Sequence, residues 1–323
     1  MIEAFTRFST HNSTIFCFFT NLDLAMSYRA SIMASMNKLT IAKRAEVIGL
    51  LCQGMSMRAI NRATGVARQT ISDLLENVGR AASDYQAEAF VRLGCKVVEC
   101  DEIWSFFYTE EKYIRHDEQG EFGYGDVWTW TAIDADTKLV PTWLVGERNL
   151  EDACAFLLDL KARLKDSRIQ LTTDDLRTFM KVVDGLWADD IDFAMLYRIY
   201  GSGKRGEDPD TAYSPAICTG IDIRVISGHP DRSRISTSYV ERQNLTMRMG
   251  MRRFTRLNNG FSKKVEFHAH AVSLNFMYYN FARPHQSLRI KNADGSYMKR
   301  TPAMAAGLSD YVWSAWEIAK LLD

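Results

Sequence analysis

Apolar residues recur every three or four positions in the first part of the chain that has a recognisable pattern. This spacing predicts a helix over 39–55, a second over 57–63 and a third over 67–80. Gly65 lies in the connection before the third helix, where glycine readily takes the left-handed backbone conformation. A tight turn before the last of three helices is typical of a helix-turn-helix, so we assign 36–82 to such a domain.

The first turn of the third predicted helix carries Arg68, Gln69 and Thr70. In a helix-turn-helix this turn meets base edges in the major groove of DNA, and arginine and glutamine suit guanine and adenine. A three-helix bundle used only for packing is the alternative. Two positions depart from the usual motif, because Asn61 replaces a small apolar residue and Thr64 replaces a leucine.

A different pattern follows, in which short β-rich runs alternate with amphipathic helices. Acidic residues stand inside the apolar run 96–107, and further acids end the run 168–175. This order predicts a mixed α/β sheet with flanking helices over 94–290. The predicted elements are strands over 96–107, 127–133 and 138–145, a helix over 150–164, a strand over 168–175 and a helix to about 187.

Three acids from separate segments, Asp101, Asp174 and Glu241, are the candidate catalytic and metal-binding residues. A carboxylate in an apolar strand must be paired, protonated or metal-bound, because burial of a bare charge is costly. Three convergent carboxylates would suit Mg²⁺ or Mn²⁺, and two such ions would serve phosphoryl chemistry. Each acid also has a structural alternative: a buried salt bridge for Asp101, a helix cap for Asp174, and a capping box of Ser238 with Glu241.

The stretch 242–264 carries seven basic residues and no acid, immediately after Glu241. A carboxylate at the head of a basic helix is understandable if the acid holds a metal ion and the bases hold a polyanion. A solvated charged face is the alternative. We expect Met247, Met251 and Phe254 to pack inward. The candidate DNA-binding residues here are Arg248, Arg252, Arg253, Arg256, Lys263 and Lys264.

The amino-acid composition excludes some classes of protein but does not indicate a function. The 323 residues carry 40 basic and 40 acidic side chains, so any polyanion must bind local patches. The six cysteines form no C-x-x-C pair, which argues against a zinc ribbon or a disulfide framework. We expect 1–35 to be a disordered or non-native extension, 201–210 a mobile loop and 291–323 a helical tail. The apolar run near the start is too short to span a bilayer.

Four segments deserve comparison as a set: Cys100–Phe106, Gly125–Asp134, Leu171–Asp174 and Ser236–Asn244. Matched in this order, they resemble the "insertion sequence one" family of bacterial DDE transposases. The resemblance covers roughly 38–310. It implies a ribonuclease H-like catalytic domain in which Asp101, Asp174 and Glu241 form the acidic triad. Relatives usually have glycine after the second aspartate, where this chain has Asp175. The closing motif, Tyr279–Leu288 with Thr301–Ala303, resembles the closing segment of other insertion-sequence transposases and of retroviral-type integrases.

The resemblance implies a bacterial, cytoplasmic enzyme that binds the terminal inverted repeats of an insertion element. It would use Mg²⁺ or Mn²⁺ to cleave double-stranded DNA and to join the freed 3′-hydroxyl to a target. Because two element ends must be handled together, we expect a homodimer or a larger assembly. A catalytically inactive, transposase-derived DNA-binding protein and a structure-specific nuclease of the same fold are the alternatives.

Overall fold

A six-stranded mixed sheet is the centre of the computed structural model, which describes residues 39–107, 125–166, 168–200, 218–255 and 264–323. The spatial order is β3-β2-β1-β4-β5-β6. Strands β1, β2 and β3 are antiparallel, β4 and β5 run parallel to β1, and β6 is antiparallel to β5. The strands are β1 (Val97–Phe107), β2 (Gly125–Asp134), β3 (Trp143–Gly146), β4 (Gln170–Thr173), β5 (Asp192–Tyr200) and β6 (Cys218–Ser227).

This order and direction define a ribonuclease H-like sheet, which confirms the predicted fold class. An antiparallel β1–β2–β3 meander is extended by two parallel strands that each follow a helix, as right-handed crossover connections require. Strand β1 is central and runs past the carboxyl end of β4. It therefore borders an antiparallel neighbour on one side and a parallel neighbour on the other, the kind of place where α/β proteins build sites.

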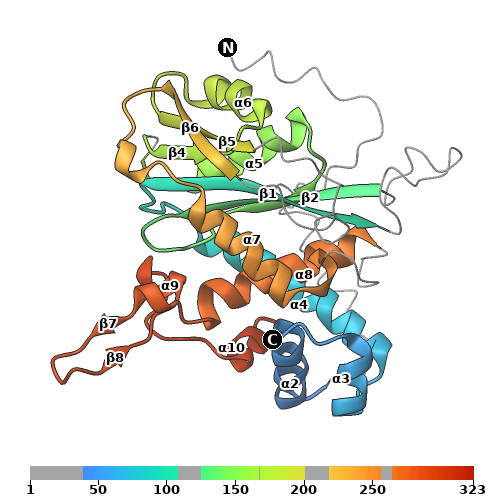
Figure 1. Cartoon of the computed structure of the whole chain (residues 1–323). Coiled ribbons are helices and arrows are strands. Elements are labelled where there is room, and N and C mark those ends of the chain that lie inside the picture. Colours follow the sequence, from blue (N-terminus) through green and yellow to red (C-terminus); the bar gives the residue numbers. More distant parts are fainter. Residues whose placement is uncertain (1–38, 108–124, 167, 201–217, 256–263) are drawn as a thin grey trace, which may run out of the picture. The chain divides into compact units, whose positions relative to one another are not determined.

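Helices cover both faces of the sheet (Figure 1). One face packs against α5 (Leu150–Arg163) and α6 (Arg177–Trp187), with Trp130, Phe156 and Phe179 fully buried between them. The other face packs against α7 (Ser238–Gly250) and α8 (Val265–Met277) through a second apolar cluster that includes Ile103, Val240 and Phe276. As predicted, Met247, Met251 and Phe254 are buried.

The three helices predicted before the sheet are α2 (Ile41–Cys52), α3 (Met57–Thr64) and α4 (Arg68–Ala89). Gly65 has a φ of 73° and ends α3. The two unusual polar residues stabilise the turn: the Asn61 amide donates to the Val66 carbonyl (2.7 Å), and the Thr64 hydroxyl donates to the Ile60 carbonyl (2.8 Å). These bonds supply partners that an apolar residue could not, so the departures from the motif are compatible with it.

Helix α4 continues beyond the predicted boundary at residue 82 and packs along α8. The contact is close at Gly79, where an added Cβ would lie 2.6 Å from the Cβ and carbonyl oxygen of His270. The Ser273 hydroxyl donates to the Gly79 carbonyl (2.7 Å). One continuous helix therefore carries the exposed Arg68 and Gln69 at one end and contacts a helix beneath the sheet at the other.

The structure corrects several element predictions. Strands β5 and β6 were not predicted, and β3 is shorter than 138–145. The terminal helix is α10 (Ala315–Lys320), which packs on α2, where Arg44 also pairs with Asp323 (2.6 Å). The predictions for 1–35 and for the loop 201–210 lie outside the described residues. Within the described ranges, no helix is long and apolar enough to cross a membrane.

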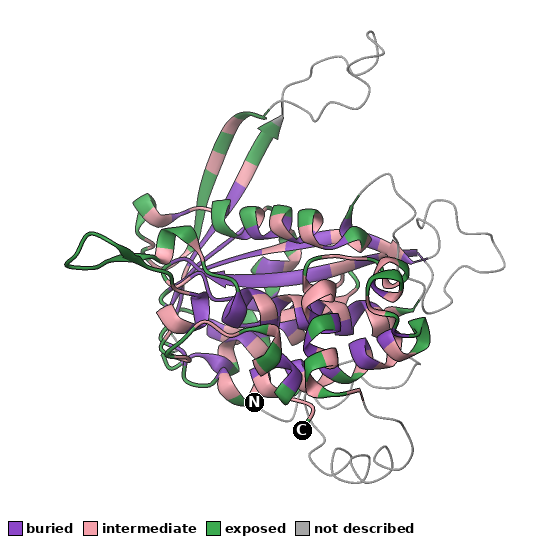
Figure 2. Cartoon of the chain, turned by 90° about the horizontal axis from the view of Figure 1, so that it is seen from below, coloured by how far each residue is buried: buried purple, intermediate pink, exposed green. Residues whose placement is uncertain are grey.

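Two hairpins stand out from the packed body (Figure 2). One is the β5–β6 ribbon, whose outer strand is largely exposed. The other joins β7 (Ile290–Lys291) to β8 (Tyr297–Met298), and both of its strands are exposed. It follows a π-helical turn (Tyr278–Ala282) and precedes the short helix α9 (Pro302–Ala305).

Candidate active site

Parallel pairing places two of the predicted acids side by side. Cys100 on β1 is in register with Thr173, the last residue of β4, so Asp101 and Asp174 follow at neighbouring positions. Asp174 ends its strand and accepts a hydrogen bond from the Leu176 backbone N–H (3.2 Å) before α6 begins. It thus stabilises the turn that leads into the helix, although the residue at the N-cap position itself is Leu176.

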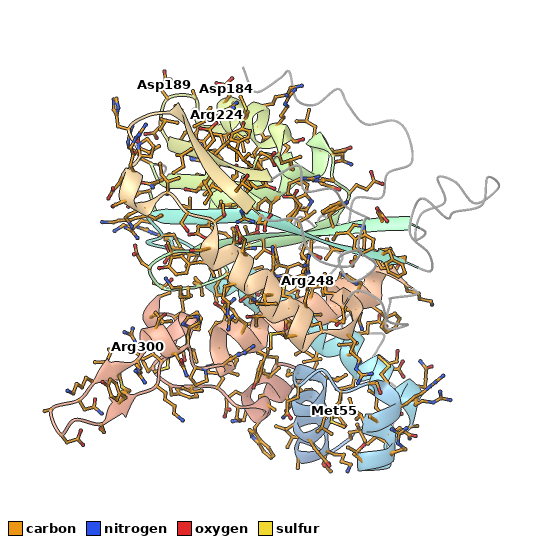
Figure 3. All side chains as sticks on the ribbon, viewed as in Figure 1. Met55, Asp184, Asp189, Arg224, Arg248 and Arg300 are labelled. Atoms are coloured by element: carbon orange, nitrogen blue, oxygen red, sulfur yellow. The ribbon has the colours of Figure 1, made fainter. Side chains whose placement is uncertain are left out.

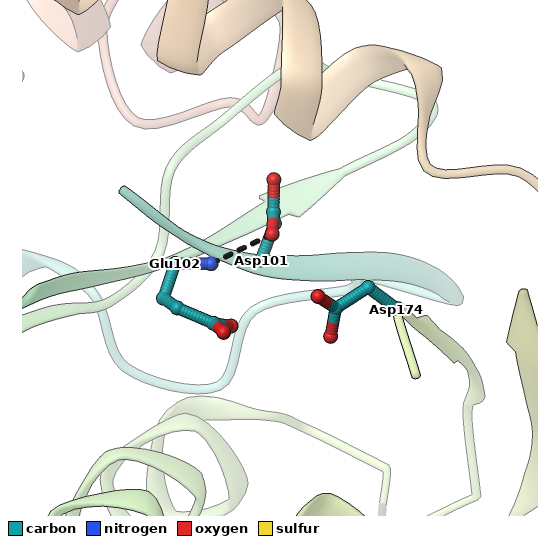
Figure 4. Close-up of side chains that lie close together, drawn as sticks. All are labelled: Asp101, Glu102 and Asp174. Carbon is teal, nitrogen blue, oxygen red and sulfur yellow. Dashed lines mark hydrogen bonds between the residues drawn. The ribbon is translucent and has the colours of Figure 1, made fainter. Parts of the chain in front are cut away.

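A third acid of this group is Glu102, which the sequence analysis did not select (Figure 4). Within the described residues, carboxylate oxygens of Asp101, Glu102 and Asp174 lie within 4.8 Å of one another and could hold a metal ion. The Glu102 side chain is only 2 % exposed, and its Oε2 has no hydrogen-bond partner among the described residues. A buried carboxylate oxygen without a donor is available to a cation.

Burial and mutual repulsion raise the pKa values of this group. Burial raises the pKa of Asp101 to about 7, and the charge of Asp174 adds to the shift. For the same two reasons the pKa of Glu102 rises to about 8, although Arg148 opposes the shift. Burial also raises the pKa of Asp174. Because the ionised carboxylates repel one another and are poorly solvated, a bound cation would stabilise their charged forms.

Two arginines border the acids. Arg148 donates from Nε to Glu102 (2.6 Å), lies 4.0 Å from Asp174 and stacks over the Trp128 ring at 4.8 Å. Arg198 on β5 pairs with Glu241 and is near enough to lower the pKa of both Asp101 and Asp174. Arg198 thus pairs directly with Glu241, whereas only its charge acts on Asp101 and Asp174. Among the described residues, Glu241 is not a member of the close group that Asp101, Glu102 and Asp174 form.

Helix α7 brings Glu241 toward the sheet, and β1 holds this helix at two points. The Glu99 carboxylate accepts hydrogen bonds from the backbone N–H groups of Tyr239 (2.7 Å) and Val240 (3.0 Å). One turn further along, the Asn244 amide donates to Asp101 (2.8 Å). Glu241 lies between these two tethers, and its own side chain accepts from Thr237 and pairs with Arg198.

The predicted capping box of Ser238 and Glu241 is not formed. Ser238 is the first residue of α7, and the N-cap residue Thr237 makes no side-chain cap hydrogen bond to the helix backbone. Glu99 replaces the local cap because two free N–H groups at a helix start favour an anionic acceptor. The salt bridge considered for Asp101 is likewise absent among the described residues: its oxygens accept from the Asn244 amide and the Glu102 backbone N–H.

The basic residues after Glu241 have different environments. Arg248, labelled on α7 in Figure 3, is half-buried, whereas Arg252 and Lys264 are exposed. Arg253 turns inward and donates from Nη1 to the Phe267 carbonyl (2.8 Å), so its guanidinium contributes to the packing of α8. Burial lowers the pKa of Arg253 to about 10. Arg256 and Lys263 lie outside the described residues.

Five residues of the site were not predicted from the sequence, and only some of them carried a local signal. Glu99 and Glu102 stand in the same acidic strand as Asp101, so alternating acids in an apolar run were a usable signal. Asn244 is three residues after Glu241, a spacing that shares a helix face. Arg148 and Arg198 carried no such local signal, because only the sheet order brings them to the acids.

Some solved structures of transposases are similar in structure to this chain. No protein-family model matches the chain, and no curated protein matches it. A piggyBac transposase synaptic complex with hairpin DNA is 12% identical over 92% of this chain and 74% of that one, with a TM-score of 0.39. A Mos1 transposase paired-end complex with the left transposon end is 12% identical over 52% and 64%, with a TM-score of 0.21.

A Mos1 mariner paired end complex with Mn gives the same coverage at 11% identity and a TM-score of 0.21. The chain thus spans about two thirds of the Mos1 structures that it matches. These superpositions are partial. The ribonuclease H-like fold of this chain is defined by its own strand order and strand directions.

Proposed function

We propose that the chain is a DNA transposase that cleaves and joins DNA strands at the ribonuclease H-like sheet. The observation that carries the proposal is the close group of Asp101, Glu102 and Asp174, which β1 and β4 bring together from segments about 70 residues apart. The hydrogen bond from Asn244 to Asp101 holds the helix of Glu241 next to this group, and Arg198 pairs with Glu241. The resemblance of the surrounding motifs to insertion-sequence transposases supports the same reading. The exposed first turn of α4, with Arg68, Gln69 and Thr70, would contact the inverted repeats.

The chemistry of the donor set fits a divalent cation. All candidate ligands are carboxylate oxygens, the donors that Mg²⁺ and Mn²⁺ prefer, and the orphaned Glu102 oxygen is part of the group. Asp101, Asp174 and either Glu241 or Glu102 would hold the cation. When bound, two such cations would supply charge neutralisation and activation of the attacking oxygen in an in-line displacement at phosphorus.

The protein's own residues would position the DNA and the acids. Arg148 and Arg198 lie at the edge of the acidic group and are suited to hold phosphate oxygens next to the scissile bond. Asn244 orients Asp101 through its amide, and Glu99 holds the start of α7. Exposed Arg252 and Lys264, with Arg248, Arg256 and Lys263, would bind flanking phosphates. Two DNA ends would require two copies of the chain.

A strand-cleavage assay tests this function. The purified full chain is incubated with duplex DNA carrying the inverted repeats that flank its gene, with Mg²⁺, Mn²⁺ or EDTA. We expect metal-dependent nicking that Asp101→Asn and Asp174→Asn abolish, while the exposed control Asp189→Asn nicks normally. Comparison of Glu241→Gln with Glu102→Gln identifies the third ligand. Nicking that persists in EDTA, or that survives Asp101→Asn, would refute the proposal.

Asp175 does not by itself argue against catalysis. Among the described residues, the non-glycine residues with positive φ are Arg92, Lys138 and Ala188, so position 175 does not demand the glycine found in relatives. Its charge does raise the pKa of Asp174. We therefore expect Asp175→Gly to increase nicking at low Mg²⁺ concentration, because the neighbouring ligand then ionises more easily.

One observation favours the alternative of a DNA-binding protein without catalysis. Arg198 pairs with Glu241, and a persistent ion pair would leave this carboxylate less available to a metal. That alternative predicts specific binding to the inverted repeats with no nicking at any metal concentration. Nicking of the same DNA by Arg198→Gln, but not by the unaltered chain, would show that the ion pair blocks the reaction.

A further inference from the structure

The hairpin that joins β7 and β8 has a surface unlike that of the packed body. Every residue from Arg289 to Lys299 is exposed, including Ile290, Tyr297 and Met298. From Arg283 to Arg300 the chain carries five arginines and lysines and a single acid, Asp294. An isolated two-stranded hairpin is only marginally stable in water, so this one needs a local reason for its structure.

The turn supplies that reason through its own polar groups. The Asn292 backbone N–H donates to the Ser296 carbonyl (2.8 Å), and Gly295 has a φ of 84°. The Ser296 N–H and hydroxyl both donate to one oxygen of Asp294 (2.9 and 2.6 Å), which lowers the pKa of that carboxyl. The only acid of the hairpin is thus engaged at its tip, away from the basic residues.

The strand register separates two faces. Lys291 lies opposite Tyr297, and Ile290 lies opposite Met298. The Arg289 guanidinium lies 4.4 Å from the centre of the Tyr297 ring, which places it on the same face as Lys291. Strand alternation adds Lys299 to that face. One side of the hairpin is therefore cationic and aromatic, and the other presents the apolar pair Ile290 and Met298, with Arg300 following at the hairpin base.

The positive charge continues from the hairpin toward the candidate active site. The His285 backbone N–H donates to the Arg300 carbonyl (2.9 Å) at the hairpin base, which Figure 3 labels at Arg300. Burial lowers the pKa of His285, and the positive charges of Lys138, Arg283 and Arg242 add to the shift. Arg242 directly follows Glu241. Cationic side chains thus extend from the acid on α7 to the exposed hairpin.

We infer that Arg289–Arg300 is a β-ribbon arm that binds the phosphate backbone of the duplex DNA whose strand lies in the active site. A two-stranded ribbon is narrow enough for the major groove, and arginine and lysine are the residues that contact phosphates. This inference rests on the proposed function, because it takes the polyanion to be the DNA substrate. The arm would add phosphate contacts distant from both the helix-turn-helix and the acids.

The salt dependence of DNA binding tests the arm. Full-length protein is titrated onto fluorescein-labelled duplex DNA between 50 and 300 mM NaCl, with EDTA present to prevent cleavage. The variant replaces Arg289, Lys291 and Lys299 with alanine. The control replaces three exposed bases elsewhere, Arg92, Lys165 and Lys181, and so removes the same charge. Because the altered side chains are exposed, both variants should keep the wild-type thermal unfolding curve.

Each lost phosphate contact lowers the slope of log K against log salt by about 0.9, so the arm variant should lose about 2.7 from its slope. This corresponds to a fall in affinity of up to about 500-fold at 0.1 M salt, whereas the control should change little. A photoreactive residue in place of Tyr297 should also crosslink to the DNA.

The failures of the two proposals can be told apart. If the unaltered chain binds DNA and the arm variant has the same slope, the arm inference is wrong while the proposed function stands. Equal losses in the arm variant and the control would also overturn the inference, because general charge would then explain the effect. If the unaltered chain binds no duplex DNA, the proposed function itself fails.

Discussion

Neutralising Asp101 should stabilise the protein at high pH while it removes activity. The buried carboxyl has a pKa of about 7, raised from 3.8 by burial and by the charge of Asp174. A raised folded-state pKa means that the folded protein binds the proton more tightly than the unfolded chain does. Stability is therefore highest below about pH 4, falls as the pH rises toward 7, and is constant above that.

The magnitude follows from the two pKa values. Relative to low pH, the shifted pKa of Asp101 lowers the free energy of unfolding by about 4 kcal/mol at pH 8 but only by about 1.5 kcal/mol at pH 5. Asparagine at this position avoids the cost. It can accept only one of the two hydrogen bonds, from Asn244 or from the Glu102 N–H, and losing the other costs about 1 kcal/mol. We expect Asp101→Asn to be nearly neutral at pH 5 and about 3 kcal/mol more stable than the unaltered chain at pH 8.

Urea unfolding of both proteins at pH 5 and pH 8 in EDTA measures this difference. The m-values should agree, since both proteins expose the same surface on unfolding. The exposed Asp189→Asn, whose position is labelled in Figure 3, is the control and should show no such pH dependence. If Asp101→Asn is less stable at pH 8, its charge is favourably paired in the fold, and the electrostatic argument for a cation site is wrong.

Three further predictions concern the surroundings of the site. Glu99→Ala leaves the buried N–H group of Val240 and the part-buried N–H group of Tyr239 without their acceptor and should lower the free energy of unfolding by about 2–3 kcal/mol. Glu99→Gln keeps one acceptor and should cost less in the same urea titration. Gly79→Ala places a methyl group 2.6 Å from His270 and should cost about 1–3 kcal/mol; no loss would show that α4 and α8 separate easily. At pH 8, Mg²⁺ at 100 times its dissociation constant should raise stability by about 2.7 kcal/mol, and Asp174→Asn should remove this effect in a thermal melt.

Local sequence patterns predicted the elements whose main contacts are with residues close to them in the sequence. The helix-turn-helix could be predicted because Gly65 and the apolar spacing act within a few residues of one another. Strand β5 could not, since its run of Asp192–Tyr200 resembles any short buried segment until it is paired with β4. Strand β6 was missed although apolar and polar residues alternate from Ile221 to Val225, which is a usable strand signal. The sequence does not show that β6 is an exposed edge strand paired with β5.

For the candidate site, too, some features could be predicted from the sequence and others depend on the fold. The sequence by itself determined which acids stand in unusual surroundings: Asp101 inside an apolar strand, Asp174 at a strand end and Glu241 before a basic stretch. Only the tertiary structure decided their neighbours, because register between β1 and β4 pairs Asp101 with Asp174, and strand order brings Arg198 to Glu241. The physical reason is that burial and charge interactions depend on distance in space, and the distance between two residues in the fold does not follow from their separation along the chain.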